Sequence, residues 1–101
     1  MKVYRLNRQG RLPIPKEVRI NMSWLEGELL DVYISPNSKY IIIEPSKPQS
    51  IYNQCIYFQG RITIPKEIRN ILKLTEHDLL QINNNPGKLI VKKVNEKSHV
   101  I

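Results

Sequence analysis

The stretch GRLPIPKEVR occupies residues 10–19, and GRITIPKEIR repeats it at residues 60–69. When the chain is aligned with itself at an offset of 50 positions, 10 of the 24 residue pairs between residues 10–33 and 60–83 are identical. Self-similarity of this kind identifies an internal duplication. Two copies are too few for a solenoid, which needs about three or more stacked units. The repeat therefore predicts a closed unit with internal pseudo-twofold symmetry, the single-chain equivalent of a homodimer.

Size and composition restrict the class of protein. The chain has 101 residues, of which 41% are hydrophobic, and half of it is near the lower size limit for a stable core. We therefore expect the two repeats to fold together. The single cysteine, Cys55, cannot form an internal disulfide, and no apolar segment has the length of a signal peptide or a membrane span. We expect a cytoplasmic protein without a membrane segment.

The positive charge is concentrated in the front part of each repeat. Residues 1–24 carry a net charge of +5 and residues 51–74 carry +3, whereas residues 25–50 carry −2 and residues 75–101 carry +1. A basic segment that recurs at the same place in two repeats is typical of a surface that binds a polyanion. The alternative is that the charge only keeps a small domain soluble.

Each repeat is predicted to begin with two short strands and a helix. Alternating polar and apolar residues favour a strand over residues 2–7, a polar turn closes at Gly10, and a second strand follows at residues 11–14. Pro13 lacks an N–H and favours a strand edge. Pro15 and Pro65 suit the first position of a helix. The expected buried helical positions are Val18, Met22 and Leu25 in the first copy and Ile68, Ile71 and Leu72 in the second.

A polar corner and a hairpin complete each repeat, which therefore reads ββαββ. The predicted hairpin strands are residues 29–34 and 40–43 in the first copy and 79–83 and 89–91 in the second, with turns at residues 35–38 and 84–87. The predicted organisation is a first repeat at residues 1–44, a linker at 45–50, a second repeat at 51–94 and a tail at 95–101. The two prolines of the linker make it semi-rigid.

The repeated motif, the short helix, the acidic corner and the hairpin together resemble the swapped-hairpin DNA-binding domain of the AbrB/MazE/SpoVT family. The resemblance covers nearly the whole chain, and its most specific parts are residues 10–19 and 60–69. It implies a mostly β fold with short helices, in which hairpins from the two ββαββ repeats interlock into one β-barrel. In most members two chains supply the two copies, whereas here one chain supplies both as an intrachain pseudo-dimer.

The resemblance also implies a basic face that binds double-stranded DNA. Arginine and lysine neutralise phosphates, and arginine can also read base edges or enter a narrow minor groove. The expected DNA-binding residues are Arg5, Arg8, Arg11, Lys16, Arg19, Arg61, Lys66 and Arg69.

The sequence departs from the family pattern at several positions. Ile20 and Asn70 stand where many relatives have a second basic helix residue, and His77 stands at a usual glycine position. At the constant offset of 50, Cys55 and Phe58 replace Arg5 and Arg8. Unequal halves favour an asymmetric DNA site over a palindrome.

Other kinds of site have little support in the sequence. His77, His99 and Cys55 lack metal-ligand spacing, and no catalytic constellation or phosphate-cradling loop is present. We therefore expect neither an enzyme nor a cofactor or metal. The function expected is a DNA-binding transcriptional regulator that forms a homodimer. The alternatives are the antitoxin of a toxin-antitoxin pair, which would have a toxin as its protein partner, and a protein-binding barrel that does not bind DNA.

Overall fold

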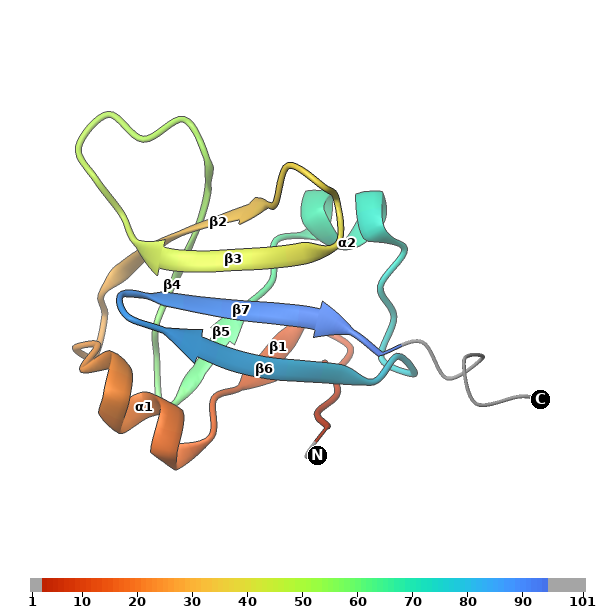
Figure 1. The fold of residues 1–101 in the computed structure, drawn as a ribbon, viewed down its shortest axis with the longest axis horizontal. Helices are drawn as coiled ribbons and strands as arrows, with labels where there is room; N and C mark the ends of the chain where they lie inside the picture. Colours follow the sequence, from red (N-terminus) through yellow and green to blue (C-terminus); the bar gives the residue numbers. More distant parts are fainter. Residues whose placement is uncertain (1–2, 95–101) are drawn as a thin grey trace.

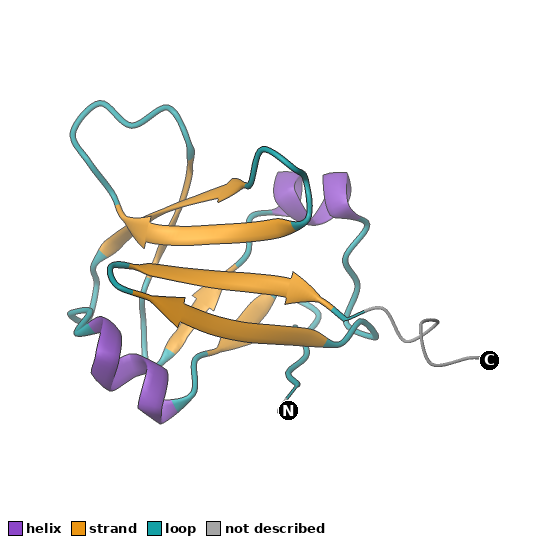
Figure 2. Cartoon of the chain, viewed as in Figure 1, coloured by secondary structure: helices purple, strands orange, loops and turns teal. Residues whose placement is uncertain are grey.

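The computed structural model describes residues 3–94 (Figure 1). Its strands are β1 (Arg11–Pro13), β2 (Leu29–Ile34), β3 (Tyr40–Pro45), β4 (Asn53–Ile56), β5 (Arg61–Thr63), β6 (Leu80–Asn85) and β7 (Lys88–Lys93). Its helices are α1 (Lys16–Met22) and α2 (Lys66–Leu72). Figure 2 shows that strands dominate the fold and that the two helices lie at opposite corners of the view. The expected mostly β fold with two short helices is confirmed.

The strands form two antiparallel sheets. One has five strands in the order β4-β2-β3-β7-β6, and the other consists of β1 and β5. Within residues 3–94 the strands do not close into one barrel, so the expected barrel closure is wrong. β1 and β5 have three residues each and form a single ladder with each other. Because the N–H of the next residue, Ile14, donates to the second half, Pro13 faces the other edge of β1, where it has no N–H to offer a further strand.

Strand pairing crosses between the two halves of the chain. β4 comes from the second half, yet it pairs with β2 of the first half over four positions, from Leu29↔Ile56 to Val32↔Asn53. Conversely, Tyr4 of the first half and Leu80 of the second half exchange two backbone hydrogen bonds of 2.8 Å. β3 also pairs with β7. Neither half therefore completes its own sheet, which agrees with the expectation that they fold together.

Equivalent residues of the repeat face each other at two places. Leu12 pairs with Ile62 at the centre of the β1–β5 ladder. In the β3–β7 ladder Ile42 pairs with Ile90, and these two are equivalent because they lie opposite Tyr33 and Asn83 in their own hairpins. The backbone N–H of Ile14 donates to the Gly60 carbonyl, and that of Ile64 donates to the Gly10 carbonyl, both at 2.8 Å. The contact between the halves is thus nearly symmetric.

The core lies between the two sheets. Leu12 and Ile62 of the small sheet pack in one cluster with residues of the large sheet such as Leu30, Ile43 and Leu89. All five side chains are at most 1% exposed. At roughly 1.5–3 kcal/mol for each fully buried leucine or isoleucine, this shared cluster is the main force that holds the small sheet in place.

The prolines precede the helices by one position. Pro15 and Pro65 have ψ near 145° and are the N-caps, not the first helical residues. Extended ψ is expected at an N-cap. Each helix has seven residues and ends where a residue adopts the left-handed conformation, Ser23 with φ 55° and Lys73 with φ 54°.

The buried faces of the helices are narrower than the sequence pattern predicted. Val18, Met22 and Leu72 pack against the core, and Ile68 is buried, as expected. Leu25 and Ile71 were expected there too, but they are 74% and 60% exposed. Two-turn helices have one narrow buried stripe, and Leu25 lies beyond the end of α1. Trp24 is buried instead, and its ring meets that of Tyr57 edge-on at 5.7 Å.

Two further expectations change at the ends of elements. The strand expected over residues 2–7 is reduced, within the described residues, to the single bridge at Tyr4. β6 continues to Asn85 and pairs it with Lys88, so only Pro86 and Gly87 form the turn that was expected over residues 84–87. The tail predicted at residues 95–101, with His99, lies outside the described residues.

Asp31 in β2 fixes the linker between the halves. Its side chain is buried, and its Oδ1 accepts hydrogen bonds from Ser50 Oγ at 2.8 Å and Gln54 Nε2 at 3.4 Å. Burial raises the pKa of this carboxyl, but hydrogen bonds from Ser50, Ser46, Gln54 and the backbone of Lys47 outweigh burial and hold the pKa below its usual value. The ionised carboxylate therefore stabilises the fold.

Candidate nucleic-acid interface

The small sheet, which we call the arginine ribbon (Arg11–Pro13 and Arg61–Thr63), presents two cations on one face. Side chains alternate between the two faces of a strand, and the middle residues Leu12 and Ile62 point into the core. Arg11 and Arg61 therefore point outward, and both are exposed. Pairing places Arg11 opposite Thr63 and Arg61 opposite Pro13. The two predicted Gly-Arg arginines are thus brought together on the same outer surface.

The turns that lead into the ribbon differ in length. In the first half the N–H of Asn7 donates to the Arg11 carbonyl across three turn residues, and Asn7 Oδ1 accepts from the N–H groups of Gln9 and Arg11. In the second half Phe58 and Arg61 exchange two backbone hydrogen bonds of 3.0 Å across only two residues. The first turn contains one additional residue.

This difference corrects the alignment of the segments before the turns. Tyr4 pairs with Leu80 where Cys55 pairs with Leu30, so Tyr4 and Cys55 are structural counterparts. Phe58 corresponds to Asn7 by its pairing with the ribbon arginine. The expectation that Cys55 and Phe58 stand in for Arg5 and Arg8 is therefore wrong. A constant offset hid the change because the motif itself has no insertion.

Each glycine of the Gly-Arg motifs is covered by an arginine from the other half. A Cβ on Gly10 would lie 2.5 Å from Nε of Arg69, and a Cβ on Gly60 would lie 2.9 Å from Nη1 of Arg19. Both glycines also have positive φ, 81° and 73°. The turn was expected to need glycine for its backbone conformation. The space taken by the opposite arginine is a second reason, which the linear sequence could not reveal.

Arg69 is more constrained than Arg19. Its Nε donates a 2.9 Å hydrogen bond to the carbonyl of Ile64, and its side chain is half-buried. Arg19 is exposed. The helical arginines therefore extend the ribbon on both sides, Arg69 hydrogen-bonded to the backbone and Arg19 exposed against Gly60.

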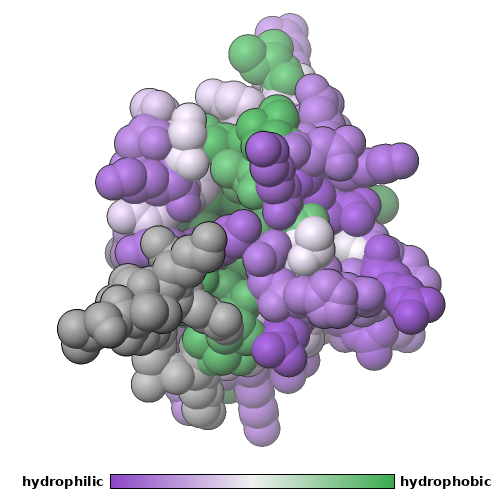
Figure 3. Space-filling model, turned by 90° about the vertical axis from the view of Figure 1, so that its right-hand side faces the viewer, coloured by the Kyte–Doolittle hydropathy of each residue, from purple (hydrophilic) through white to green (hydrophobic). Residues whose placement is uncertain are grey.

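The remaining predicted site residues are exposed at the margins. Lys16 and Lys66 are the first residues of α1 and α2, and Arg5 lies on the segment before the first turn. Arg8 forms a 3.5 Å salt bridge with Glu76, and it is the one predicted site residue with such a bridge within residues 3–94. Figure 3 shows the side of the molecule at the right of Figure 1 as mostly hydrophilic with hydrophobic areas between.

The acidic corners have structural partners. Glu28 accepts a 2.9 Å hydrogen bond from the N–H of Leu25, and Asp78 accepts a 2.8 Å bond from that of Thr75. These bonds give the two carboxylates a structural role at the corner after each helix. Glu26 accepts from the N–H of Gln59, so it also holds the turn of the second half.

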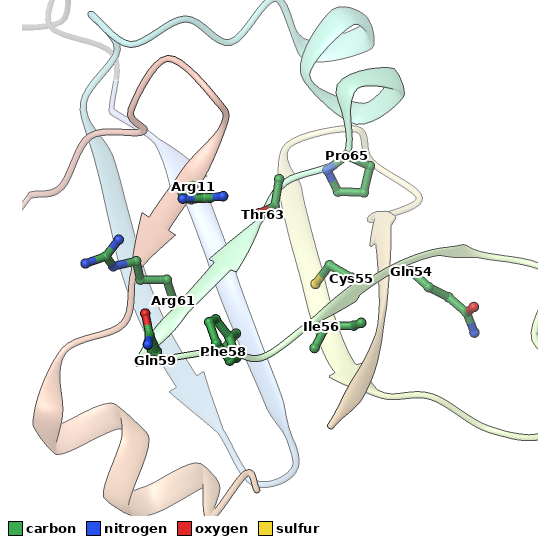
Figure 4. A pocket seen from close by; sticks show the side chains of 9 residues that line it. All are labelled: Arg11, Gln54, Cys55, Ile56, Phe58, Gln59, Arg61, Thr63 and Pro65. Atoms are coloured by element: carbon green, nitrogen blue, oxygen red, sulfur yellow. The ribbon is translucent and has the colours of Figure 1, made fainter. Parts of the chain in front are cut away.

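A hollow of about 600 Å³ lies beside the ribbon (Figure 4). Arg11 and Arg61 border it together with Thr63. The rest of its lining comes from the second half and combines apolar side chains, including Ile56 and Phe58, with Gln54 and Gln59. Sequence reasoning missed this apolar part of the surface. The alternation in residues 55–58, with Cys55 and Tyr57 inward, could have indicated that Ile56 and Phe58 face outward.

Cys55 is not suited to nucleophilic chemistry. It borders the hollow, but its side chain is buried, and burial raises the pKa of the thiol to about 11. The thiol is therefore protonated at neutral pH, whereas nucleophilic cysteines react as thiolates. Within residues 3–94 no group of three or more histidine, cysteine or acidic side chains could hold a metal ion.

Comparisons with protein-family models, with curated proteins and with solved structures found no match to this chain. None of the helices formed by residues 3–94 combines the length and the apolar character needed to cross a membrane.

Proposed function

We propose that this protein is a double-stranded DNA-binding transcriptional regulator with the swapped-hairpin architecture of the AbrB/MazE/SpoVT family. Strand pairing between the halves supports the architecture, since β4 completes the sheet beside β2 and Tyr4 bridges to β6. One chain would then supply the two copies that two chains supply in most members. Pairing with a second chain into a homodimer would double the number of DNA-contacting ribbons.

The arginine ribbon is the observation that carries the proposal. Arg11 and Arg61 project from one face of a two-stranded element, and Arg19 and Arg69 flank it. A ribbon of two strands has the dimensions to enter a major groove. The net charge of +7 and its position at the front of each repeat favour a polyanion. Binding would release counterions from the phosphates and occlude promoter DNA.

The test is fluorescence anisotropy with AT-rich and GC-rich duplexes across a salt series. The wild type is compared with Arg11→Ala/Arg61→Ala and with the control Lys39→Ala/Lys47→Ala, which removes the same charge at exposed positions outside the ribbon. The plot of log K against log salt concentration has a negative slope. If both arginines contact phosphates, this slope becomes shallower by about 1.8 in the ribbon variant. The control should change little.

Two outcomes would reject this proposal. Absence of wild-type binding at low salt would exclude DNA as the ligand. Equal losses in the ribbon variant and the control would show that attraction depends on total charge and not on the ribbon.

A second candidate function, a protein-binding module, is favoured by the exposed apolar residues Leu29, Ile56 and Phe58. It predicts no DNA binding and loss of a protein partner when these residues become polar. The antitoxin alternative depends on a toxin-binding segment after the last strand, where residues 95–101 lie outside the described part of the chain.

A further inference from the structure

The two ends of the arginine ribbon carry different chemistry. Asn7 lies opposite Arg11 at one end, and Phe58 lies opposite Arg61 at the other. Paired residues of antiparallel strands project from the same face, so Phe58 shares the outer face with Arg61. The polar side chain of Asn7 is occupied within its own turn. Phe58 therefore breaks the symmetry of a face that is otherwise nearly symmetric.

The aromatic ring is exposed, and its neighbours continue the apolar surface. Phe58 is 56% exposed and Ile56 is 55% exposed. Leu29, the strand partner of Ile56, is 43% exposed. In the first half the counterpart of Ile56 is Arg5. The same alignment, shifted by one residue, makes Asn7 the counterpart of Phe58. Contiguous exposed apolar side chains usually mark a binding surface, whereas isolated ones do not.

The charges around Phe58 favour DNA as the occupant. Figure 4 shows its side chain between Ile56 on one side and Gln59 and Arg61 on the other. Arg11 borders the same hollow. An apolar side chain flanked by arginines complements a base beside phosphates. Aromatic and aliphatic side chains contact thymine methyl groups in the major groove or wedge between base steps in the minor groove.

Given the proposed function, on which this inference rests, we propose that Phe58 makes an apolar contact with a base in the bound duplex and determines specificity in one half of the site. The first half of the protein presents Arg5, Asn7 and Arg8 at the equivalent place, so the other half of the DNA site lies against polar and charged groups instead of an aromatic ring. The preferred DNA site is therefore asymmetric. The half that faces Phe58 contains a thymine or an easily unstacked pyrimidine–purine step.

The variant Phe58→Asn installs the residue type of the other end without altering charge. The control Ile51→Asn removes an apolar side chain that is 91% exposed directly after the linker. Phe58→Leu keeps an apolar side chain at this position and serves as the control for a loss of binding that is caused by misfolding. Binding sites are selected from a random duplex pool with the wild type and with Phe58→Asn, and affinities for the wild-type site are then measured across a salt series.

We expect an asymmetric wild-type site and about a tenfold loss of affinity for it in Phe58→Asn, with an unchanged salt slope. The selected site of Phe58→Asn should lose its preference in one half only. Ile51→Asn should match the wild type, and Phe58→Leu should retain most of the affinity. If the wild type binds DNA but Phe58→Asn binds the same site equally well, the inference is wrong and the regulator proposal stands. If the wild type binds no DNA, both fail and the apolar surface is assigned to a protein partner.

Discussion

β1 and β5 meet through equivalent residues, Leu12 opposite Ile62, and each is followed by a seven-residue helix that begins after a proline. The segments that precede them differ. The second half supplies a four-residue strand, β4, whereas the first supplies the single bridge at Tyr4. In the β1–β5 ladder the same motif meets itself, so both copies share one contact. The outer segments instead pair with a different strand of the other half, β4 with β2 and Tyr4 with Leu80 of β6, so the two segments can differ without disturbing the contact between the motifs.

The largest effect should come from the glycines of the shared motif. Gly10→Ala should destabilise the protein by about 2 kcal/mol, because of its positive φ and the overlap with the constrained Arg69. Gly60→Ala should cost about 1 kcal/mol, because the overlap involves the flexible end of Arg19. Urea unfolding of both variants measures the difference. Equal losses would mean that Arg69 is not held more tightly than Arg19.

The two halves also differ at the position of Asp31, the residue that holds the linker. Its counterpart in the second half is Gln81, which carries no charge. The folded-state pKa of Asp31 is lowered from 3.8, so its stabilising effect is complete above that value and is lost as pH falls through the folded-state pKa. Asp31→Asn should therefore cost about 1 kcal/mol at neutral pH and progressively less below pH 3.8. Thermal unfolding across pH measures this, with Gln81→Asn as the control. A pH-independent loss would contradict the assigned role of the carboxylate.

The smallest effect is expected for the turn that contains the additional residue. Arg8→Ala should reduce stability by at most about 0.5 kcal/mol, because its salt bridge with Glu76 is exposed. The double-mutant cycle with Glu76→Ala should give a coupling energy of similar size that disappears at high salt. A coupling well above 1 kcal/mol would show that this bridge, and not the hydrogen bonds of Asn7, defines the turn.

Local signals predicted much of the fold. Pro15 and Pro65 located both helices within one residue, and the turn residues at 35–38 and 84–87 located the two hairpins. These features depend on neighbours in the chain, which a single sequence displays. The prediction of barrel closure failed because closure depends on hydrogen bonds between distant segments, which local sequence patterns do not reveal.

The candidate site was predictable in its cations but not in its apolar part. The repeat identified Arg11 and Arg61 as a pair, and the structure places them on one face. The significance of Phe58 depended on a one-residue difference in turn length. That difference arises from Asn7, whose side chain caps a three-residue turn, and from Gln59, which adopts positive φ in a tighter one. Such choices between turns follow from side-chain geometry that spacing does not encode.

The bridge between Tyr4 and Leu80 also affects the order in which the chain folds during its synthesis. Its two residues lie far apart in the sequence, so this contact cannot form before Leu80 has left the ribosome. Until β4 is synthesised, the edge of β2 has no partner and exposes unpaired backbone groups. A nascent first half can then take β4 from a neighbouring complete chain. High local concentrations during expression should therefore favour dimers joined by exchanged segments, with the same strand pairs formed between chains instead of within one.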